Sequence, residues 1–163
     1  MECICDTNVF DAYHKINALE DLFLLDTDFL MYTDTIEREL IDPPGFGMLL
    51  LSLGLIPIKL QGFETFLIME FSKKFPRLSI HDSVALTIAK SRNLTLLTGD
   101  NNLRKAAYNV KVPVIGSIGI LDKLYKTEAI SRSRYIAILE KFLEKSQRLR
   151  LPEKEIQTRL KDV

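Results

Sequence analysis

The chain has 163 residues, and it is poor in glycine, proline and cysteine, the residues that mark fibrous, disordered and disulfide-rich proteins. Glycine occurs 7 times and proline 6 times, and hydrophobic residues make up 47%, which excludes a disordered, collagen-like or low-complexity chain. Only two cysteines are present, Cys3 and Cys5. On an extended segment, residues two apart point to the same face, so we expect small core residues in a reducing compartment rather than a disulfide framework. The length suits a single domain.

The chain also lacks net charge and a long apolar run. Lys and Arg number 22, as do Asp and Glu, so the whole molecule is not a polycation. Residues 1–122 nevertheless carry a net charge of −5 and residues 123–163 one of +5. The first residues have neither a basic start nor an apolar stretch, and the most apolar region, residues 46–58, is shorter than the ~20 residues of a membrane span. We therefore expect a cytoplasmic protein without a membrane segment.

Several catalytic motifs are missing. The sequence has no Gly-x-x-x-x-Gly-Lys phosphate loop and no Gly-x-Ser-x-Gly elbow, and its Gly116-Ser-Ile-Gly119 segment is better interpreted as a helix start than as a dinucleotide fingerprint. No Cys-x-x-Cys or His-Glu-x-x-His pattern occurs, which disfavours zinc. The two histidines, His14 and His81, are expected at the surface or beside a site rather than as metal ligands.

Strand and helix patterns alternate along the chain, which is typical of an α/β domain with a mostly parallel sheet. Strands are expected at residues 3–5, 29–32, 56–60, 94–98 and 112–115, the third at a sheet edge because of Pro57. Helical patterns fill the intervals, and two of them, residues 48–55 and the stripe through Phe63, Phe66 and Phe71, are predicted to be core. We place a core domain at residues 1–127 and a basic helical extension at 128–163. Its helix at 135–143 is expected either to pack on the core or to face a partner.

Acidic residues follow two of the predicted strands. Asp6 ends the first and Asp100 follows the fourth, each in a short turn before a helix. Ligands of open parallel sheets bind at the carboxyl ends of strands where the strand order reverses, so both side chains are expected in one crevice. The alternative for each is structural, an Asx turn or a helix N-cap.

Two further acids are candidates on helices. Asp82 fits a Ser79-x-x-acid capping box, which is its structural alternative, and Asp34-Thr-Ile-Glu37 fits a second box that would occupy Glu37. Glu39 lies on the inward side of its helix, where an unpaired carboxylate is costly. Four carboxylates in one crevice would raise one another's pKa, and Mg²⁺ or Mn²⁺ is the ordinary remedy.

These acids give the chain a resemblance to the PIN-domain family of metal-dependent nucleases, many of which are toxins of toxin–antitoxin pairs. Cys5-Asp6-Thr7-Asn8, Glu39-Leu40, His81-Asp82-Ser83-Val84 and Thr98-Gly99-Asp100-Asn101 look like the four acidic motifs of that family, in the family's order. Asn102 stands where many relatives carry a further acid, and Glu37 competes with Glu39 for the second position. The resemblance implies a three-layer α/β/α fold with a central, mostly parallel sheet, followed here by the C-terminal helical extension.

The resemblance also implies an activity. The expected function is an Mg²⁺- or Mn²⁺-dependent endoribonuclease for single-stranded or looped RNA, with Asp6, Glu39, Asp82 and Asp100 as metal-binding catalytic acids. Supporting positions are Asn8, Thr98 and Asn102, and basic residues that would border the RNA are Arg38, Arg104 and Lys105, with Arg132, Arg134, Arg148 and Arg150 in the extension. A homodimer and a small antitoxin partner are implied.

Three alternatives stay open at this point. The first is a noncatalytic RNA-binding or scaffold protein of the same fold, and the second is a housekeeping RNA-processing nuclease. The third is an α/β phosphotransfer enzyme with an aspartyl nucleophile, which is disfavoured because Asn8 stands where the second Asp of its opening Asp-x-Asp motif would be.

Overall fold

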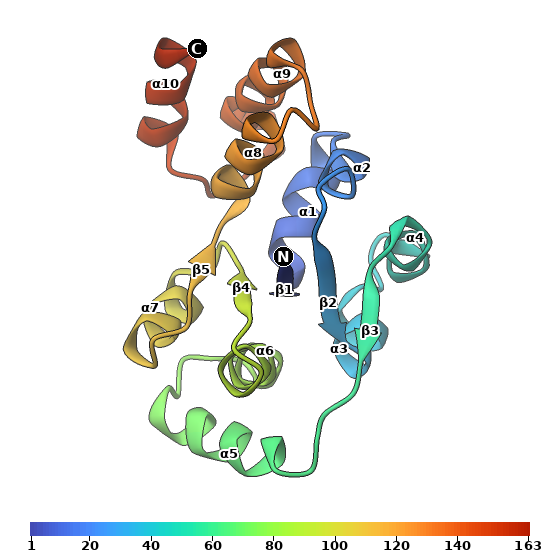
Figure 1. Ribbon diagram of the computed structural model, residues 1–163, viewed down its shortest axis with the longest axis vertical. Coiled ribbons are helices and arrows are strands. Elements are labelled where there is room, and N and C mark those ends of the chain that lie inside the picture. The colour runs from blue at the N-terminus through green and yellow to red at the C-terminus, as the bar shows by residue number, and fades with distance from the viewer.

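The computed structural model describes residues 1–163 and contains one five-stranded sheet whose pairings are all parallel (Figure 1). The strand order is β3-β2-β1-β4-β5. The strands are β1 (Glu2–Cys5), β2 (Asp28–Tyr32), β3 (Ile56–Ile58), β4 (Thr95–Leu97) and β5 (Val114–Ile115). From β1 the chain adds β2 and then β3 on one side of the sheet. It then returns to the centre, where β4 pairs with the free edge of β1 and β5 follows. The order therefore reverses between β1 and β4, which is the place where such sheets form their ligand crevice.

Helices cover both faces of the sheet, as the alternating pattern predicted. One hydrophobic cluster, with Cys3 and Cys5 from β1, packs under the N-terminal and C-terminal helices, and another, with Ile4, packs under the middle ones. The predicted shared face of the two cysteines is confirmed. Helices on the first side are α1 (Thr7–Lys15), α2 (Leu19–Leu22), α4 (Phe46–Leu53), α8 (Ser117–Lys126), α9 (Arg132–Leu143) and α10 (Glu153–Asp162). On the second are α5 (Glu64–Lys74), α6 (Ile80–Ser91) and α7 (Asn101–Asn109), while α3 (Thr33–Glu39) follows β2 and a 3₁₀ turn spans Lys145–Gln147. The three-layer α/β/α fold is confirmed.

The C-terminal extension packs on the core. The rings of Tyr13 in α1 and Phe142 in α9 meet edge to face, with their centroids 5.4 Å apart, and both side chains belong to the first cluster. Arg134 forms an ion pair with Asp21, N–O 2.6 Å, and so fixes α9 against α2. Its guanidinium is therefore engaged within the protein, which gives Arg134 a structural role beside its predicted one near RNA. None of the helices is long and apolar enough to cross a membrane.

Two predicted core segments are partly exposed. Met48 in α4 is 72% exposed, so this helix is buried on one side rather than on several. Phe63 and Phe66 are 58% and 78% exposed, and the buried positions of α5 are Glu64, Ile68 and Phe71 instead. The expectation failed because a glutamate occupies the first position of the buried stripe, so the apolar pattern alone selects the wrong face.

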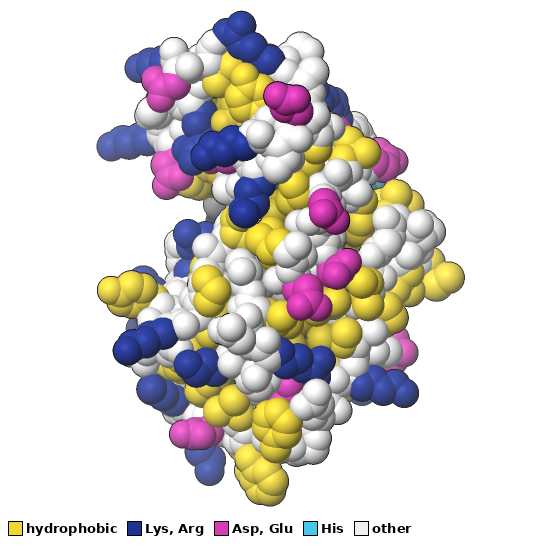
Figure 2. Space-filling model, viewed as in Figure 1, with side chains coloured by type: hydrophobic (Ala, Val, Ile, Leu, Met, Phe, Trp, Pro, Cys, Tyr) yellow, Lys and Arg dark blue, Asp and Glu magenta, His cyan; other side chains and the backbone are white.

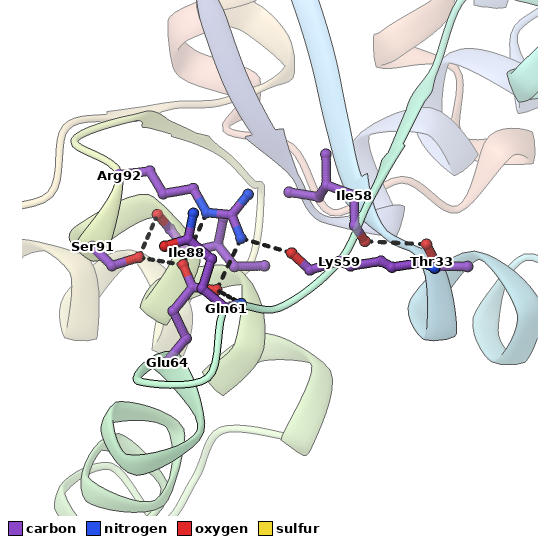
Figure 3. Close-up of polar contacts among 8 residues, drawn as sticks. All are labelled: Thr33, Ile58, Lys59, Gln61, Glu64, Ile88, Ser91 and Arg92. Atoms are coloured by element: carbon purple, nitrogen blue, oxygen red, sulfur yellow. Dashed lines mark hydrogen bonds and ion pairs between the residues drawn. The ribbon is translucent and has the colours of Figure 1, made fainter.

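Glu64 joins α5 to the end of α6 (Figure 3). Its side chain is fully buried, and its carboxylate accepts hydrogen bonds from the Arg92 guanidinium at 2.9 Å, from Ser91 Oγ at 2.6 Å and from the Gln61 N–H at 2.7 Å. Burial opposes ionisation, but the hydrogen bonds from Arg92, Gln61 and Ser91 outweigh it and lower the pKa of Glu64 to about 2. The ionised form is therefore the stable one in the folded protein.

We predict that Glu64→Gln lowers the free energy of unfolding by about 3 kcal/mol at pH 7, because it leaves Arg92 without a charged partner in a mostly buried site. Since the pKa of Glu64 is depressed from its ordinary 4.5, the contribution is complete above pH 4.5 and is lost as pH falls toward 2. Urea denaturation of both proteins across this range measures the difference. The exposed ion pair of Asp11 and Lys15 supplies the control, and Asp11→Asn should change stability by less than about 1 kcal/mol. Equal stability of Glu64→Gln and wild type at pH 7 would contradict the assignment.

Candidate functional site

The site is built around Asp6, which directly follows β1. Its backbone N–H donates to the Leu97 carbonyl at 2.9 Å and so continues the pairing of β1 with β4. One carboxylate oxygen, Oδ2, accepts hydrogen bonds from Thr98 Oγ1 at 2.6 Å and from Asn8 Nδ2 at 2.5 Å. The Thr98 side chain is fully buried, and its hydroxyl also accepts the Asp100 N–H at 3.0 Å. One hydroxyl thus ties together the turns that carry two of the predicted acids.

Two neighbouring contacts hold these turns in place. Asn8 accepts the Gly99 N–H at its Oδ1, 3.0 Å, so its amide bridges the turn after β1 to the turn after β4. Arg104 donates to the Thr98 carbonyl at 3.3 Å and lies so close to Gly116 that a Cβ there would come within 2.8 Å of its Nη1. The predicted supporting positions Asn8 and Thr98 therefore contact the acids. Asn102 makes no hydrogen bond to them and lines a hollow beside the end of α5.

Asp82 and Asp100 both occupy helix starts, as their structural alternatives required. Asp82 Oδ2 accepts the Ser79 N–H at 2.9 Å in a complete capping box, and Asp100 Oδ1 accepts the Leu103 N–H at 2.8 Å as the N-cap of α7. The second predicted box, Asp34 with Glu37, is wrong: α3 begins at Thr33 without a side-chain cap, and Asp34 pairs with Arg38 instead.

Glu39, and not Glu37, borders the crevice. Glu39 Oε2 accepts a long hydrogen bond, 3.4 Å, from Thr7 Oγ1, and Glu39 and Asp6 line one small cavity together with His81. Glu37 is exposed and lines no cavity at the site. The cavity has a volume of about 10 Å³, which is room for about one water molecule or ion. His81 Nδ1 is hydrogen-bonded to the buried Thr35 hydroxyl at 2.9 Å, a contact that nothing in the sequence singled out.

Every one of the four acids keeps one carboxylate oxygen without a hydrogen bond from the protein. The bonded oxygens are Asp6 Oδ2, Glu39 Oε2, Asp82 Oδ2 and Asp100 Oδ1, and no donor reaches the other oxygen of each group. The structural role of a cap and a role in binding are therefore compatible, because each uses a different oxygen atom.

The electrostatics of the site disfavour a charge on Asp6. Burial is the largest cause and, with the nearby charges of Asp82, Glu39 and Asp100, raises the pKa of Asp6 to about 6, although the Thr98 hydrogen bond acts in the opposite direction. The charges of all three other acids thus reach Asp6, with that of Asp82 the strongest of them.

The residues fit a hard divalent cation in chemistry and charge, since their free donors are carboxylate oxygens around a site that carries excess negative charge. They are not gathered as closely as the sequence predicted, because no three Asp, Glu, His or Cys side chains are near enough to hold an ion directly. Mg²⁺ usually keeps several of its waters, and such an ion requires only one or two carboxylates in direct contact.

Comparison with known proteins agrees with the fold. A family model described as PIN domain matches residues 2–163. The chain belongs to the PIN-domain family. A similar solved structure is one chain of VapBC2 from Rickettsia felis, determined with a DNA fragment from the promoter of VapBC2. It is 15% identical to this PIN domain, with a TM-score of 0.51, and the match covers 71% of this chain and 98% of that one.

A PilT N-terminus domain protein from the hyperthermophilic archaeon Sulfolobus solfataricus P2 is 14% identical, with a TM-score of 0.46 over 76% of this chain and 92% of that one. Among curated proteins none matches the sequence. The likeness to the VapBC2 chain supports the fold, and the family membership rests on the family-model match over nearly the whole chain.

We predict that Asp6→Asn raises the free energy of unfolding by about 2 kcal/mol at pH 7 in the presence of EDTA, because it removes a charge that the fold disfavours. Since the pKa of Asp6 is raised from 3.8 to about 6, the ionisation penalty is complete above pH 6 and absent below pH 3.8. The gain should therefore vanish near pH 4. Urea denaturation at both pH values measures it, and a variant less stable than wild type at pH 7 would refute the account of this carboxylate.

Proposed function

We propose that this PIN domain is an Mg²⁺- or Mn²⁺-dependent endoribonuclease that cleaves single-stranded or looped RNA. The observation that carries the proposal is the set of four free carboxylate oxygens, one on each acid, around Asp6 at the point where the strand order reverses, with the charges of the other three acids acting on Asp6. Burial and the mutual repulsion of the acids make the charge on Asp6 unfavourable, and a bound cation would offset that charge. Membership of a family of nucleases supports the same activity.

The acids would share the work as follows. Asp6, Glu39, Asp82 and Asp100 hold the cation directly or through water, and the cation when bound supplies a water of lowered pKa and charge neutralisation at the phosphate. Thr98 and Asn8 both donate hydrogen bonds to Oδ2 of Asp6. These two bonds fix the orientation of the carboxylate, and Oδ1 stays available to the cation. His81, held through Nδ1 by Thr35, borders the same cavity and presents its other ring nitrogen as a further polar group.

RNA with unpaired bases is the favoured substrate, because a single strand can reach carboxylates set in a narrow crevice between strand ends, whereas a rigid duplex cannot. Arg104 and Lys105 follow Asp100 on α7 and form no ion pair, while Arg38, next to Glu39, is held by Asp34. We further propose a homodimer and, by analogy with the VapBC2 complex, regulation by a small antitoxin protein. A scaffold that binds RNA without cleaving it, or a housekeeping nuclease, are the alternatives.

The activity is tested with a fluorescent single-stranded RNA of mixed sequence. Wild type with Mg²⁺ or Mn²⁺ should cleave it, and excess EDTA should abolish cleavage. Asp6→Asn should reduce the rate at least 100-fold while the protein stays folded, because one metal-binding charge is lost and the shape is kept. Asp11→Asn on the outside of α1 is the matched control and should cleave normally.

Three results distinguish the alternatives. Cleavage that persists after chelation would overturn the metal-dependent mechanism. Binding of RNA without cleavage by any preparation would favour the scaffold. An adjacent gene for a small protein that blocks cleavage when co-purified would support the toxin, and a cleaving enzyme without such an inhibitor would favour the housekeeping nuclease.

A further inference from the structure

The exposed face of α7 has an unusual composition. Asn101, Arg104, Lys105 and Tyr108 follow the i, i+3, i+4, i+7 spacing of one helix face, and all are exposed, while Leu103, Ala106 and Ala107 are buried on the other side. Tyr108 is 86% exposed, the largest exposed fraction of any large hydrophobic residue in the structure. The helix has no acidic residue in Asn101–Asn109. A large aromatic ring in water and unpaired cations next to it are both unexplained by the fold.

Three hollows surround this face, and their linings are entirely free of acidic residues. One, of about 660 Å³, is bordered by Arg104, Lys105 and Tyr108; the next, of about 340 Å³, lies toward the end of α5; the third lies beside Tyr108 and the turn after α7. Their five cations are Lys74, Arg77, Arg104, Lys105 and Lys111. None of the five forms an ion pair with the protein, whereas Arg92, Arg134 and Arg159 elsewhere are held by carboxylates. Figure 2 shows Lys and Arg side chains gathered over α7 and the adjoining part of α5.

This face begins at the candidate site. Asp100 is the N-cap of α7. Arg104, one turn later, donates a hydrogen bond to the carbonyl of Thr98, whose hydroxyl donates to Asp6. At 1.5 Å per residue, Tyr108 lies about 12 Å along the helix from Asp100. A stacked strand advances about 3.4 Å per nucleotide, so about three or four nucleotides would connect the acids to the tyrosine.

We propose that the α7 face, with Tyr108 as a stacking platform and these five cations around it, binds the single-stranded RNA on one side of the cleavage point. This assignment rests on the proposed ribonuclease function, whose substrate path it specifies. Cations that form no ion pair within the protein can neutralise phosphates, an exposed aromatic ring stacks an unpaired base, and Asn101 and Asn109 offer amides to base edges. An acidic protein would use the same charge, but it gives no reason for an isolated exposed ring on the path from the acids.

Binding is measured by fluorescence anisotropy with a labelled 12-nucleotide oligouridylate, using Asp6→Asn protein in EDTA so that no cleavage interferes. Tyr108→Ala should weaken binding roughly 5- to 20-fold through loss of one base stack, and Tyr108→Phe, which keeps the ring, should stay within about twofold. Lys105→Ala should reduce the slope of log affinity against log salt by about 0.7, the value for one phosphate on a single strand. Because these side chains are exposed, thermal stability should not change.

Two control variants belong to the same experiment. Phe66→Ala removes a similarly exposed ring, 78% exposed, that lines none of the three hollows, and Lys154→Ala removes an exposed charge on α10. Both should bind RNA as the parent does.

The outcomes separate this assignment from the ribonuclease proposal. Unchanged affinity in Tyr108→Ala and Lys105→Ala, or equal affinity for a 12-base-pair duplex, overturns the stacking surface even if wild type cleaves RNA. Loss of RNA affinity in these two variants supports the surface even if wild type proves unable to cleave. Saturable binding of an acidic protein in place of RNA at this face also overturns it.

Discussion

The hydrogen bond from the Thr98 hydroxyl to the Asp6 carboxylate is the constraint on which the site depends. It joins the ends of the two strands between which the strand order reverses, and the same hydroxyl accepts the Asp100 N–H. Because Thr98 is fully buried, this hydroxyl has no water to bond instead. The bond fixes Asp6 in a place where burial and three other acids oppose its charge. The fold thus holds an unfavourable carboxylate that a bound cation would relieve, a trade of stability for function that is common at active sites.

The sheet and its layers could be predicted because their signals are local. Buried strands such as residues 29–31 are short apolar runs, and the alternation of Cys3, Ile4 and Cys5 between two clusters follows from the period of a strand. The exposure of Phe63 and Phe66 could not be predicted. Their helix turns a glutamate inward, and the stabilising partner of that glutamate, Arg92, lies 28 residues away in the sequence. A long-range ion pair leaves no periodic trace in a single sequence.

The acids of the candidate site were predictable as positions at strand ends and helix starts, but their division of roles was not. The Asp34–Glu37 and Ser79–Asp82 segments look like equivalent capping boxes in the sequence, yet only the second forms one. Helix α3 begins one residue before Asp34, so Asp34 lies inside the helix and pairs with Arg38 one turn later. The periodicity selected Glu39 over Glu37, but its predicted inward position is wrong, because Glu39 is exposed at the end of α3 and only Thr35 and Ile36 of that helix are buried. The partner of His81, Thr35, comes from a segment 46 residues distant and became visible only with the packing of α3 beside α6.

Calorimetric titration of the metal-free protein with Mn²⁺ tests most directly whether the four acids form a cation site. A cation site at these acids predicts saturable Mn²⁺ binding by wild type, at least tenfold weaker binding by Asp6→Asn, and unchanged binding by Glu37→Gln, whose side chain lies outside the crevice. Competition by Mg²⁺ should follow, since both ions prefer oxygen ligands. Equal Mn²⁺ affinity in wild type and Asp6→Asn, or no saturable binding by wild type, would contradict the account.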